Sequence, residues 1–208
     1  MTLSSLFAIY LAFAMAAMSP GPNLVMAATL TTTQGRSSGW SAGAGVITAN
    51  FLFALIAIYG MSSVVAVWPG FTHFVRLIGG TFLLWFAWKL WNSARDELNW
   101  REETRVSGLL QAYGLGLMTN LSNPKAMTFF FSIFAVLVPI DATNLERASV
   151  LLGCGVINIA WYLLFVYLFG AGFVRAHLRP VKFWLNRSAA VFLGGLGIWM
   201  IATLINSI

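Results

Sequence analysis

Hydrophobic residues in this chain gather into six long stretches, and polar residues fill the segments between them. The stretches cover residues 3–33, 41–67, 71–91, 108–138, 148–173 and 188–207. A helix needs about 20 apolar residues to cross a bilayer. Residues 51–59 read FLFALIAIY and lack the alternation of polar and apolar positions that strands of a membrane barrel require. The pattern predicts an all-α integral membrane protein with six transmembrane helices in a single domain, 1–208.

Basic residues favour one side of this predicted membrane domain. The first, third and fifth connections, with their flanks, carry most of the lysines and arginines: Arg36, Lys89, Arg95, Arg101, Arg105, Arg175, Arg179, Lys182 and Arg187. Lysine and arginine are enriched in cytoplasmic loops, so these three connections are predicted to face the cytoplasm. Both termini then lie outside. The longest polar segment, 92–107, is interpreted as a solvated cytoplasmic loop.

Composition and charge narrow the chemistry further. Hydrophobic residues make up 59% of the chain and charged residues 9%, whereas soluble domains average about 25% charged residues. The net charge of +6 is assigned to the cytoplasmic connections, so no nucleic-acid partner is predicted. The single cysteine, Cys154, excludes an internal disulfide, a cysteine zinc site and a dithiol relay. The interiors of the six stretches hold no Asp, Glu or His, so we predict no metal site, no cofactor and no enzymatic activity.

Three sequence landmarks recur in the same order in the two halves of the chain. Residues 43–47 and 153–157 read GAGVI and GCGVI, at an offset of 110. Residues 77–80 and 192–195 read LIGG and FLGG, and the Ser-Pro at 19–20 matches the Asn-Pro at 123–124. Each half contains an odd number of predicted spans, so the second half enters the membrane from the opposite face. The sequence therefore predicts two inverted three-helix repeats, at about 1–95 and 106–208, an arrangement common in secondary transporters.

The first and fourth stretches are too long for one straight span and carry proline near their middle. Each has 31 residues, which is about 46 Å of helix against a hydrocarbon core about 30 Å thick. Proline removes a backbone donor and clashes with the preceding turn. We therefore predict that helices 1 and 4 break near the bilayer midplane, at 19–23 (SPGPN) and 120–125 (NLSNPK). Broken ends in a membrane are buried in protein or line a cavity.

Lys125 follows the second break and indicates an anionic ligand. A lysine at the bilayer centre costs at least about 2.5 kcal/mol on the insertion scale. The six stretches contain no Asp or Glu to pair with it. Two half-helix N-termini at the same depth add positive partial charge and free N–H groups. The missing counter-ion is interpreted as a substrate carboxylate, and proline-kinked helices with a purely structural role are the alternative.

The two broken segments also carry a family resemblance. SPGPN at 19–23 and NLSNPKA at 120–126 resemble the paired signature segments of the LysE/RhtB amino-acid exporter superfamily. The resemblance covers nearly the whole chain, and residues 119–132 are most similar to the threonine and homoserine exporters. It implies a multi-pass carrier of the bacterial inner membrane that exports small neutral amino acids, driven by the proton-motive force. Some relatives have an acidic residue where this chain has Asn23, so no residue is assigned as the proton carrier.

The predicted substrate site joins both segments. The N–H groups that follow Pro22 and Pro124, with the ammonium of Lys125, are predicted to bind the substrate carboxylate. Six further residues shape the breaks or orient the polar ends of the substrate: Ser19, Pro20, Gly21, Asn23, Asn120 and Asn123. Thr48 and Asn158 occupy equivalent repeat positions and are predicted to line the same cavity, with hydrogen bonding between helices as the alternative.

Two carrier functions stay open on the sequence alone. The first is export of small neutral amino acids, and the alternative is a carrier or exchanger of another small carboxylate-bearing solute. A des-amino analogue separates them, because it binds only the second. The expected partners are the small solute and the lipid bilayer, with a homodimer as a further candidate. The small-residue pair Gly39 and Gly43 is assigned to packing within the chain rather than to a dimer seam.

Overall fold

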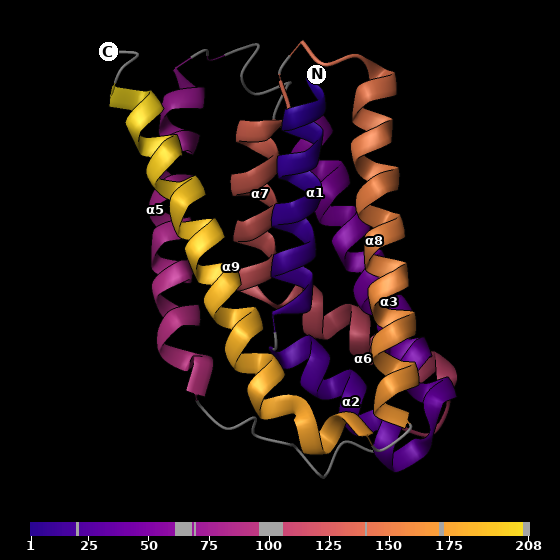
Figure 1. The fold of residues 1–208 in the computed structure, drawn as a ribbon. Coiled ribbons are helices and arrows are strands. Elements are labelled where there is room, and N and C mark those ends of the chain that lie inside the picture. The colour runs from indigo at the N-terminus through magenta and orange to yellow at the C-terminus, as the bar shows by residue number, and fades with distance from the viewer. Residues whose placement is uncertain are drawn as a thin grey trace.

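The computed structural model describes residues 1–19, 21–60, 68, 70–95, 106–139, 141–170 and 173–205. All regular structure in these residues is helical, which confirms the predicted all-α class. The elements are α1 (Leu3–Met18), α2 (Pro22–Gln34), α3 (Arg36–Leu55), the π-helical η1 (Ile56–Gly60), α5 (Phe71–Asn92), the 3₁₀ turn η2 (Ser93–Arg95), α6 (Leu109–Leu121), α7 (Pro124–Leu137), α8 (Asn144–Gly170) and α9 (Phe173–Ile205). The start of α1 and the end of α9 lie at the same end of the bundle (Figure 1).

Several of these helices are suited to a membrane. Three segments among the described residues are long and apolar enough to cross a bilayer: Arg36–Gly60, Asn144–Phe169 and Lys182–Leu204. Leu3–Met18 and Pro22–Gln34 meet the same criteria as one span bent by 54°. The helices α6 and α7 have 13 and 14 residues, about 20 Å each, so neither crosses the hydrocarbon core alone. The chain is thus an apolar helical membrane protein, and the six-span inverted repeat stays a prediction.

Helix boundaries fall at both proline-containing segments. The helix α1 ends at Met18 and α2 begins at Pro22, while α6 ends at Leu121 and α7 begins at Pro124. Proline fits the first helical position because its missing N–H would be unpaired there in any case. The helices α1 and α7 occupy the upper half of the bundle, and α2 and α6 the lower half (Figure 1). The depth of these junctions in a bilayer stays a prediction, and Pro20 lies outside the described residues.

Two apolar cores lie on the two sides of these junctions. The upper core draws on α1, α3, α5, α7, α8 and α9 and includes Phe130 and Leu193. The lower core draws on α2, α3, α6 and α8 and includes Leu30 and Val166. The two halves of each interrupted helix therefore pack into different cores. Polar side chains gather between the cores, at the junctions themselves.

The helices α3 and α6 cross with their backbones in direct contact. A Cβ on Gly116 would overlap the carbonyl oxygen of Ala42, and a Cβ on Gly45 would overlap the carbonyl oxygen of Tyr113. Only glycine permits so close an approach, because every other residue would place a carbon where the neighbouring backbone lies. This crossing positions the end of α6, and therefore the second junction, against α3.

The pair Gly39 and Gly43 packs inside the chain, as predicted. A Cβ on Gly39 would overlap the side chain of Thr31 in α2. A Cβ on Gly43 would lie 2.7 Å from Cδ1 of Tyr162 in α8. Small residues at these positions let α2 and α8 approach α3 closely.

The helix α9 extends further toward its N-terminus than the sixth apolar stretch. That stretch begins at residue 188, whereas α9 begins at Phe173. Arginine and lysine are good helix formers, and the helix continues through Pro180 although proline removes one backbone donor there. Lys182 and Arg187, interpreted from the sequence as part of a connection, are therefore helical, and Lys182 is buried. Most of the predicted third loop, residues 96–105, lies outside the described residues.

Candidate functional site

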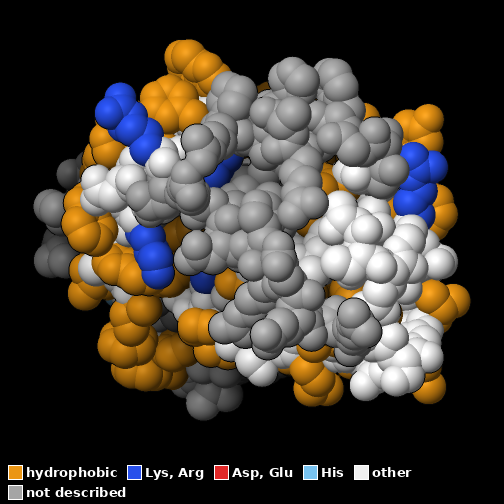
Figure 2. All heavy atoms as spheres, turned by 90° about the horizontal axis from the view of Figure 1, so that it is seen from below, with side chains coloured by type: hydrophobic (Ala, Val, Ile, Leu, Met, Phe, Trp, Pro, Cys, Tyr) orange, Lys and Arg blue, Asp and Glu red, His pale blue; other side chains and the backbone are white. Residues whose placement is uncertain are grey.

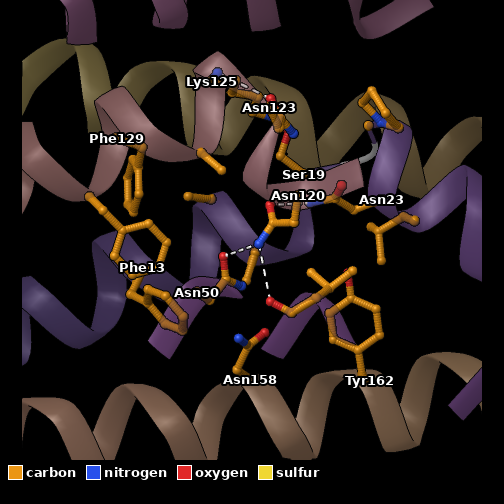
Figure 3. A pocket seen from close by; sticks show the side chains of 18 residues that line it. Phe13, Ser19, Asn23, Asn50, Asn120, Asn123, Lys125, Phe129, Asn158 and Tyr162 are labelled. Carbon is orange, nitrogen blue, oxygen red and sulfur yellow. Dashed lines mark hydrogen bonds between the residues drawn. The ribbon is translucent and has the colours of Figure 1, made fainter. Parts of the chain in front are cut away.

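A cavity of about 70 Å³ lies where α1 gives way to α2 and α6 gives way to α7. Polar side chains from both junctions, from α3 and from α8 converge on it (Figure 3). They are Ser19, Asn23, Asn50, Asn120, Asn123, Lys125, Asn158 and Tyr162. Phe13, Phe129 and Phe130 supply an aromatic wall. The cavity therefore combines one ammonium group and several amides with apolar rings, and its lining contains no carboxylate.

Asn120, at the end of α6, organises the amide groups of the cavity and is fully buried. Its Nδ2 donates hydrogen bonds to the carbonyl oxygen of Val46 at 3.1 Å and to Asn50 Oδ1 at 2.8 Å. A backbone carbonyl can only accept, so the bond to Val46 fixes the orientation of the Asn120 amide. Asn120 Oδ1 in turn accepts from Asn23 Nδ2 at 2.7 Å. These bonds join α2, α3 and α6 at the cavity wall (Figure 3).

Lys125, in the first turn of α7, supplies the positive charge of the cavity. Its Nζ donates to Ser19 Oγ at 3.5 Å and lies 4.5 Å from the centre of the Phe86 ring. A Cβ on Gly21 would lie 3.6 Å from the same Nζ. The ammonium is therefore close to the start of α2 as well as to the start of α7. A ring face and a hydroxyl stabilise a buried cation in part, but neither carries a full negative charge.

No carboxylate in the described part of the chain pairs with Lys125. The acidic residues there are Asp141 and Glu146, close to the start of α8. Glu146 forms an ion pair with the amino group of Met1, which fastens the start of α1 to α8. The cavity thus carries an uncompensated positive charge that a carboxylate ligand would neutralise.

Asn186 of α9 fixes the hydroxyl that contacts Lys125. Ser19 Oγ donates to Asn186 Oδ1 at 3.3 Å, and both residues are buried, at 4% and 1% exposed. Because its proton points to Asn186, the Ser19 hydroxyl presents a lone pair to the ammonium of Lys125. The helix α9 therefore supports the site although it contributes no residue to the cavity lining.

The start of α2 offers unpaired N–H groups to the cavity. The first backbone hydrogen bond of this helix runs from the Val25 nitrogen to the Gly21 oxygen at 3.0 Å, and no side chain caps its start. The N–H groups of Asn23 and Leu24, both lining residues, therefore have no partner within the helix. At the start of α7, Asn123 Oδ1 accepts the N–H two residues on, at 3.1 Å. The positive end of the α2 dipole is thus more open to an anion than that of α7.

Two buried amide oxygens in the cavity wall lack a donor within the described residues. They are Asn23 Oδ1 and Asn158 Oδ1. The bond from Asn23 Nδ2 to Asn120 fixes which atom of Asn23 is the unpaired one. A buried acceptor without a partner costs roughly 1–3 kcal/mol. The cavity therefore offers amide oxygens that could accept hydrogen bonds from a cation. It also offers the N–H groups at the start of α2, which could donate to an anion.

Eight of the predicted site residues reach this cavity: Ser19, Gly21, Pro22, Asn23, Asn120, Asn123, Lys125 and Asn158. Pro124 begins α7 without lining the cavity. Thr48 lies outside it, and its hydroxyl accepts from Tyr113 at 3.0 Å and donates to the Ala44 oxygen at 3.0 Å. Residues two apart on a helix point in nearly opposite directions, about 200° apart, so α3 directs Asn50 rather than Thr48 toward Asn120. Thr48 and Asn158 do line one neighbouring cavity together, with Asn50, but Thr48 does not reach the cavity of Lys125.

Asn186 is the supporting residue that sequence reasoning missed. It follows a run of basic residues interpreted as a connection, where an asparagine carries no signal of its own. Asn186, Ala190 and Leu193 recur at helical spacing, and all three are buried. That periodicity, extended below residue 188, is the signal that points to Asn186.

Comparison with known proteins identifies the family. A family model described as the LysE type translocator matches residues 14–203. The chain belongs to the LysE type translocator family. The matched region contains both junctions and every residue that lines the cavity except Phe13, and it confirms the resemblance seen in the sequence. No solved structure matches this translocator.

Curated relatives of this translocator cover most of its length at low identity. The uncharacterized membrane protein YahN of Escherichia coli is 26% identical over 84% of this chain and 80% of its own length. A threonine efflux protein of Salmonella typhimurium is 23% identical over 94% of this chain and 96% of its own length. A leucine efflux protein of Enterobacter is 24% identical over 78% of this chain and 77% of its own length.

Proposed function

We propose that this translocator is a secondary carrier that exports small neutral amino acids, with threonine-like and homoserine-like solutes as the first candidates. The observation that carries the proposal is that one cavity holds both an ammonium group and amide oxygens that lack partners. Among the described residues, no carboxylate pairs with Lys125 and no donor pairs with two buried amide oxygens. A zwitterionic amino acid carries both missing groups on a single carbon. The names of the threonine and leucine efflux relatives support the same substrate class.

The substrate carboxylate is assigned to Lys125 and to the start of α2. The ammonium and the N–H groups of Asn23 and Leu24 lie around the same junction. Hydrogen bonds between charged partners are roughly twice as strong as those between neutral ones. Ser19 holds the ammonium through its contact at 3.5 Å. The carboxylate therefore gains a charge partner and backbone donors together, as anions do at helix N-termini.

The substrate ammonium is assigned to Asn23 Oδ1 and Asn158 Oδ1. This end distinguishes the proposal from its alternative, a carrier or exchanger of another small carboxylate-bearing solute. Such a solute satisfies Lys125 but leaves both amide oxygens unpaired. One unmet acceptor at about 1–3 kcal/mol corresponds to roughly a tenfold preference for the amino acid.

The size of the cavity favours short side chains. A volume of about 70 Å³ holds on the order of five water molecules, at roughly 10–15 Å³ each. The aromatic wall of Phe13, Phe129 and Phe130 limits expansion on one side. Larger side chains require these rings to move, which costs packing free energy in the upper core.

For the transport cycle we propose a single transmembrane domain in the bacterial inner membrane, with both termini outside. Its six spans form inverted repeats at about 1–95 and 106–208, and the cavity is reached alternately from the two sides. The proton-motive force drives export. The polar lining and the apolar cores on both sides of the junctions support one translocation unit built from both halves.

Reconstituted vesicles test the proposal directly. The purified chain is placed in vesicles, and uptake of labelled threonine is followed with and without an imposed pH gradient. Unlabelled homoserine, leucine and lysine compete, together with two defective analogues: 3-hydroxybutyrate, which lacks the amino group, and 1-amino-2-propanol, which lacks the carboxylate. Homoserine is expected to compete, and each defective analogue to compete at least about tenfold less well.

Each result separates one part of the proposal from another. Uptake that the gradient accelerates establishes coupling to protons, whereas uptake that depends only on solute inside the vesicle indicates exchange. Competition by 3-hydroxybutyrate equal to that by homoserine contradicts the ammonium assignment and favours the alternative solute class. Absence of threonine flux under every condition removes threonine as the substrate.

A further inference from the structure

A second feature lies outside the cavity, on the surface between α5 and α9. A groove of about 640 Å³ runs between the end of α5 and the first half of α9, and we call it the α5–α9 groove. It is lined by Trp91, Phe183, Trp184, Arg187, Ser188, Val191 and Phe192. None of these residues lines the transport cavity. The groove therefore needs an explanation separate from amino-acid binding.

Arg187 is the charged centre of this groove. Its guanidinium carbon lies 3.6 Å from the centre of the Trp91 ring and 5.3 Å from that of Phe183. The Nε of Arg187 is buried and has no hydrogen-bond partner among the described residues. Arg95 also approaches Phe183, with its guanidinium carbon 5.8 Å from the ring centre. Two cations thus share one aromatic patch, and one of them has an open donor.

No acidic side chain of the described residues lies near this patch. Asp141 and Glu146 stand close to the start of α8, at the opposite end of the bundle. Figure 2 shows the end of the molecule near the groove, where Lys and Arg side chains are visible and no described Asp or Glu is. An anion is the natural partner for a guanidinium in this setting.

The remaining wall of the groove fits a lipid. Val191, Phe192 and the exposed Trp184 continue the groove with apolar surface above Arg187. Arg187 lies beside the exposed Trp91 and Trp184, as a residue at the headgroup boundary would. Tryptophans concentrate at that boundary in membrane proteins. A free phosphate would leave the apolar part of the groove uncovered.

We propose that the α5–α9 groove binds an anionic phospholipid, with its phosphate on Arg187 and an acyl chain along Val191 and Phe192. Basic pockets between membrane helices on the cytoplasmic side bind such headgroups, and the predicted orientation puts this end in the cytoplasm. Arg95 and Arg187 together favour a net negative headgroup over a zwitterionic one. The proposal is independent of what the central cavity transports.

Native mass spectrometry of the full chain tests this site. The purified protein is titrated with phosphatidylglycerol, with phosphatidylcholine and, separately, with inorganic phosphate. The matched variants are Arg187→Gln and Arg36→Gln; Arg36, at the start of α3 and away from the groove, is a partly exposed arginine whose guanidinium lies over the Tyr167 ring. We expect wild type to retain phosphatidylglycerol in preference to phosphatidylcholine. Arg187→Gln should weaken that binding about fivefold or more, as removal of one basic residue predicts, and Arg36→Gln should leave it unchanged.

Two further measurements distinguish loss of the lipid site from misfolding of the variant. Arg187→Lys keeps the charge but loses the planar stack on Trp91, so an intermediate affinity is expected. Phosphatidylglycerol should also raise the thermal unfolding midpoint of wild type, while inorganic phosphate at equal concentration should not. Equal lipid binding by wild type and a folded Arg187→Gln variant overturns the proposal, as does an equal loss in Arg36→Gln. Stabilisation by inorganic phosphate alone shows an anion site without lipid and overturns it as well.

Discussion

At the residue scale, the proposed function assigns the binding of the substrate carboxylate to the positive charge of Lys125. The side chain contacts Ser19 and the Phe86 ring but no carboxylate among the described residues. Replacing it by methionine keeps the stem and removes the charge. Because a hydrogen bond to a charged group contributes about 1.5–3 kcal/mol, Lys125→Met should raise KM for amino-acid uptake into vesicles at least tenfold.

The control for this prediction removes a different cation. Arg36→Met deletes a partly exposed charge beside Tyr167 that does not line the cavity, and uptake should stay at the wild-type level. If Lys125→Met keeps the wild-type KM while the protein is folded, the carboxylate assignment is wrong.

At the same scale, the proposed function assigns the substrate ammonium to Asn158. Its side chain is 2% exposed, and its Oδ1 has no donor among the described residues. Asn158→Leu removes the acceptor at similar volume, so the preference for threonine over 3-hydroxybutyrate should fall by roughly tenfold. Inhibition constants of the two solutes measure that preference. Asn144→Leu, an exposed change in the same helix, should leave the ratio unchanged; a ratio that survives Asn158→Leu contradicts the ammonium assignment.

At the scale of elements, the close crossing of α3 and α6 holds the second junction in place. A Cβ on Gly116 would overlap the Ala42 oxygen, and backbone cannot give way as a flexible side chain does. Gly116→Ala should therefore destabilise the protein by about 1–3 kcal/mol. Gly114→Ala lies in the same helix, where an added Cβ meets nothing within 4 Å. Thermal unfolding in detergent should show a clearly lower midpoint for Gly116→Ala only, and equal midpoints would refute the close-contact explanation.

At the same scale, the hydrogen bond between Ser19 and Asn186 links α9 to the first junction. Asn186 orients Ser19, and Ser19 contacts Lys125, so Asn186 is a positioning residue. Asn186→Leu and Ser19→Ala should each raise KM several-fold, since each loses about 0.5–1.5 kcal/mol of hydrogen bonding. The double variant should resemble either single variant, because the two act through one chain of contacts. If the fold increase in KM of the double variant equals the product of the two single increases, the two residues act separately.

The sequence allowed prediction of where two helices begin but not of the contacts between distant elements. Proline chemistry is local, so the starts of α2 at Pro22 and of α7 at Pro124 follow from a few residues. The bond from Ser19 to Asn186 joins residues 167 positions apart, and no spacing rule reports such a pair. Thr48 shows the same limit, because a repeat offset gives an equivalent position but not the rotation of the helix that carries it.

At the scale of the whole molecule, the interrupted helices place a polar layer between two apolar cores. The helices α1 and α7 belong to the upper core, and α2 and α6 to the lower one. Each core has its own set of buried residues, and the chain passes from one core to the other at the two junctions and along the helices α3 and α8. A carrier needs a polar site between two well-packed bodies, and this division provides one without a separate domain.

The orientation of the bundle in the membrane is the last property that follows from the whole chain. Arg36, Lys89, Arg95, Lys182 and Arg187 lie toward the end of the bundle where α3 and α9 begin, whereas Arg76 and Arg147 lie toward the end that holds the start of α1. The positive-inside rule assigns the first end to the cytoplasm, so the termini should face outward. This prediction needs a probe that cannot cross the membrane.

Single cysteines provide that probe, because Cys154 is the sole native cysteine and is buried. In a Cys154→Ser background, Ser4→Cys and Ser107→Cys mark the two ends of the bundle at exposed positions. An impermeant maleimide should label Ser4→Cys in intact spheroplasts and should label Ser107→Cys only after lysis. The reverse pattern would place the termini in the cytoplasm, and it would also put the α5–α9 groove on the outer leaflet. Labelling therefore tests the side from which the cavity is loaded and the leaflet that supplies the lipid.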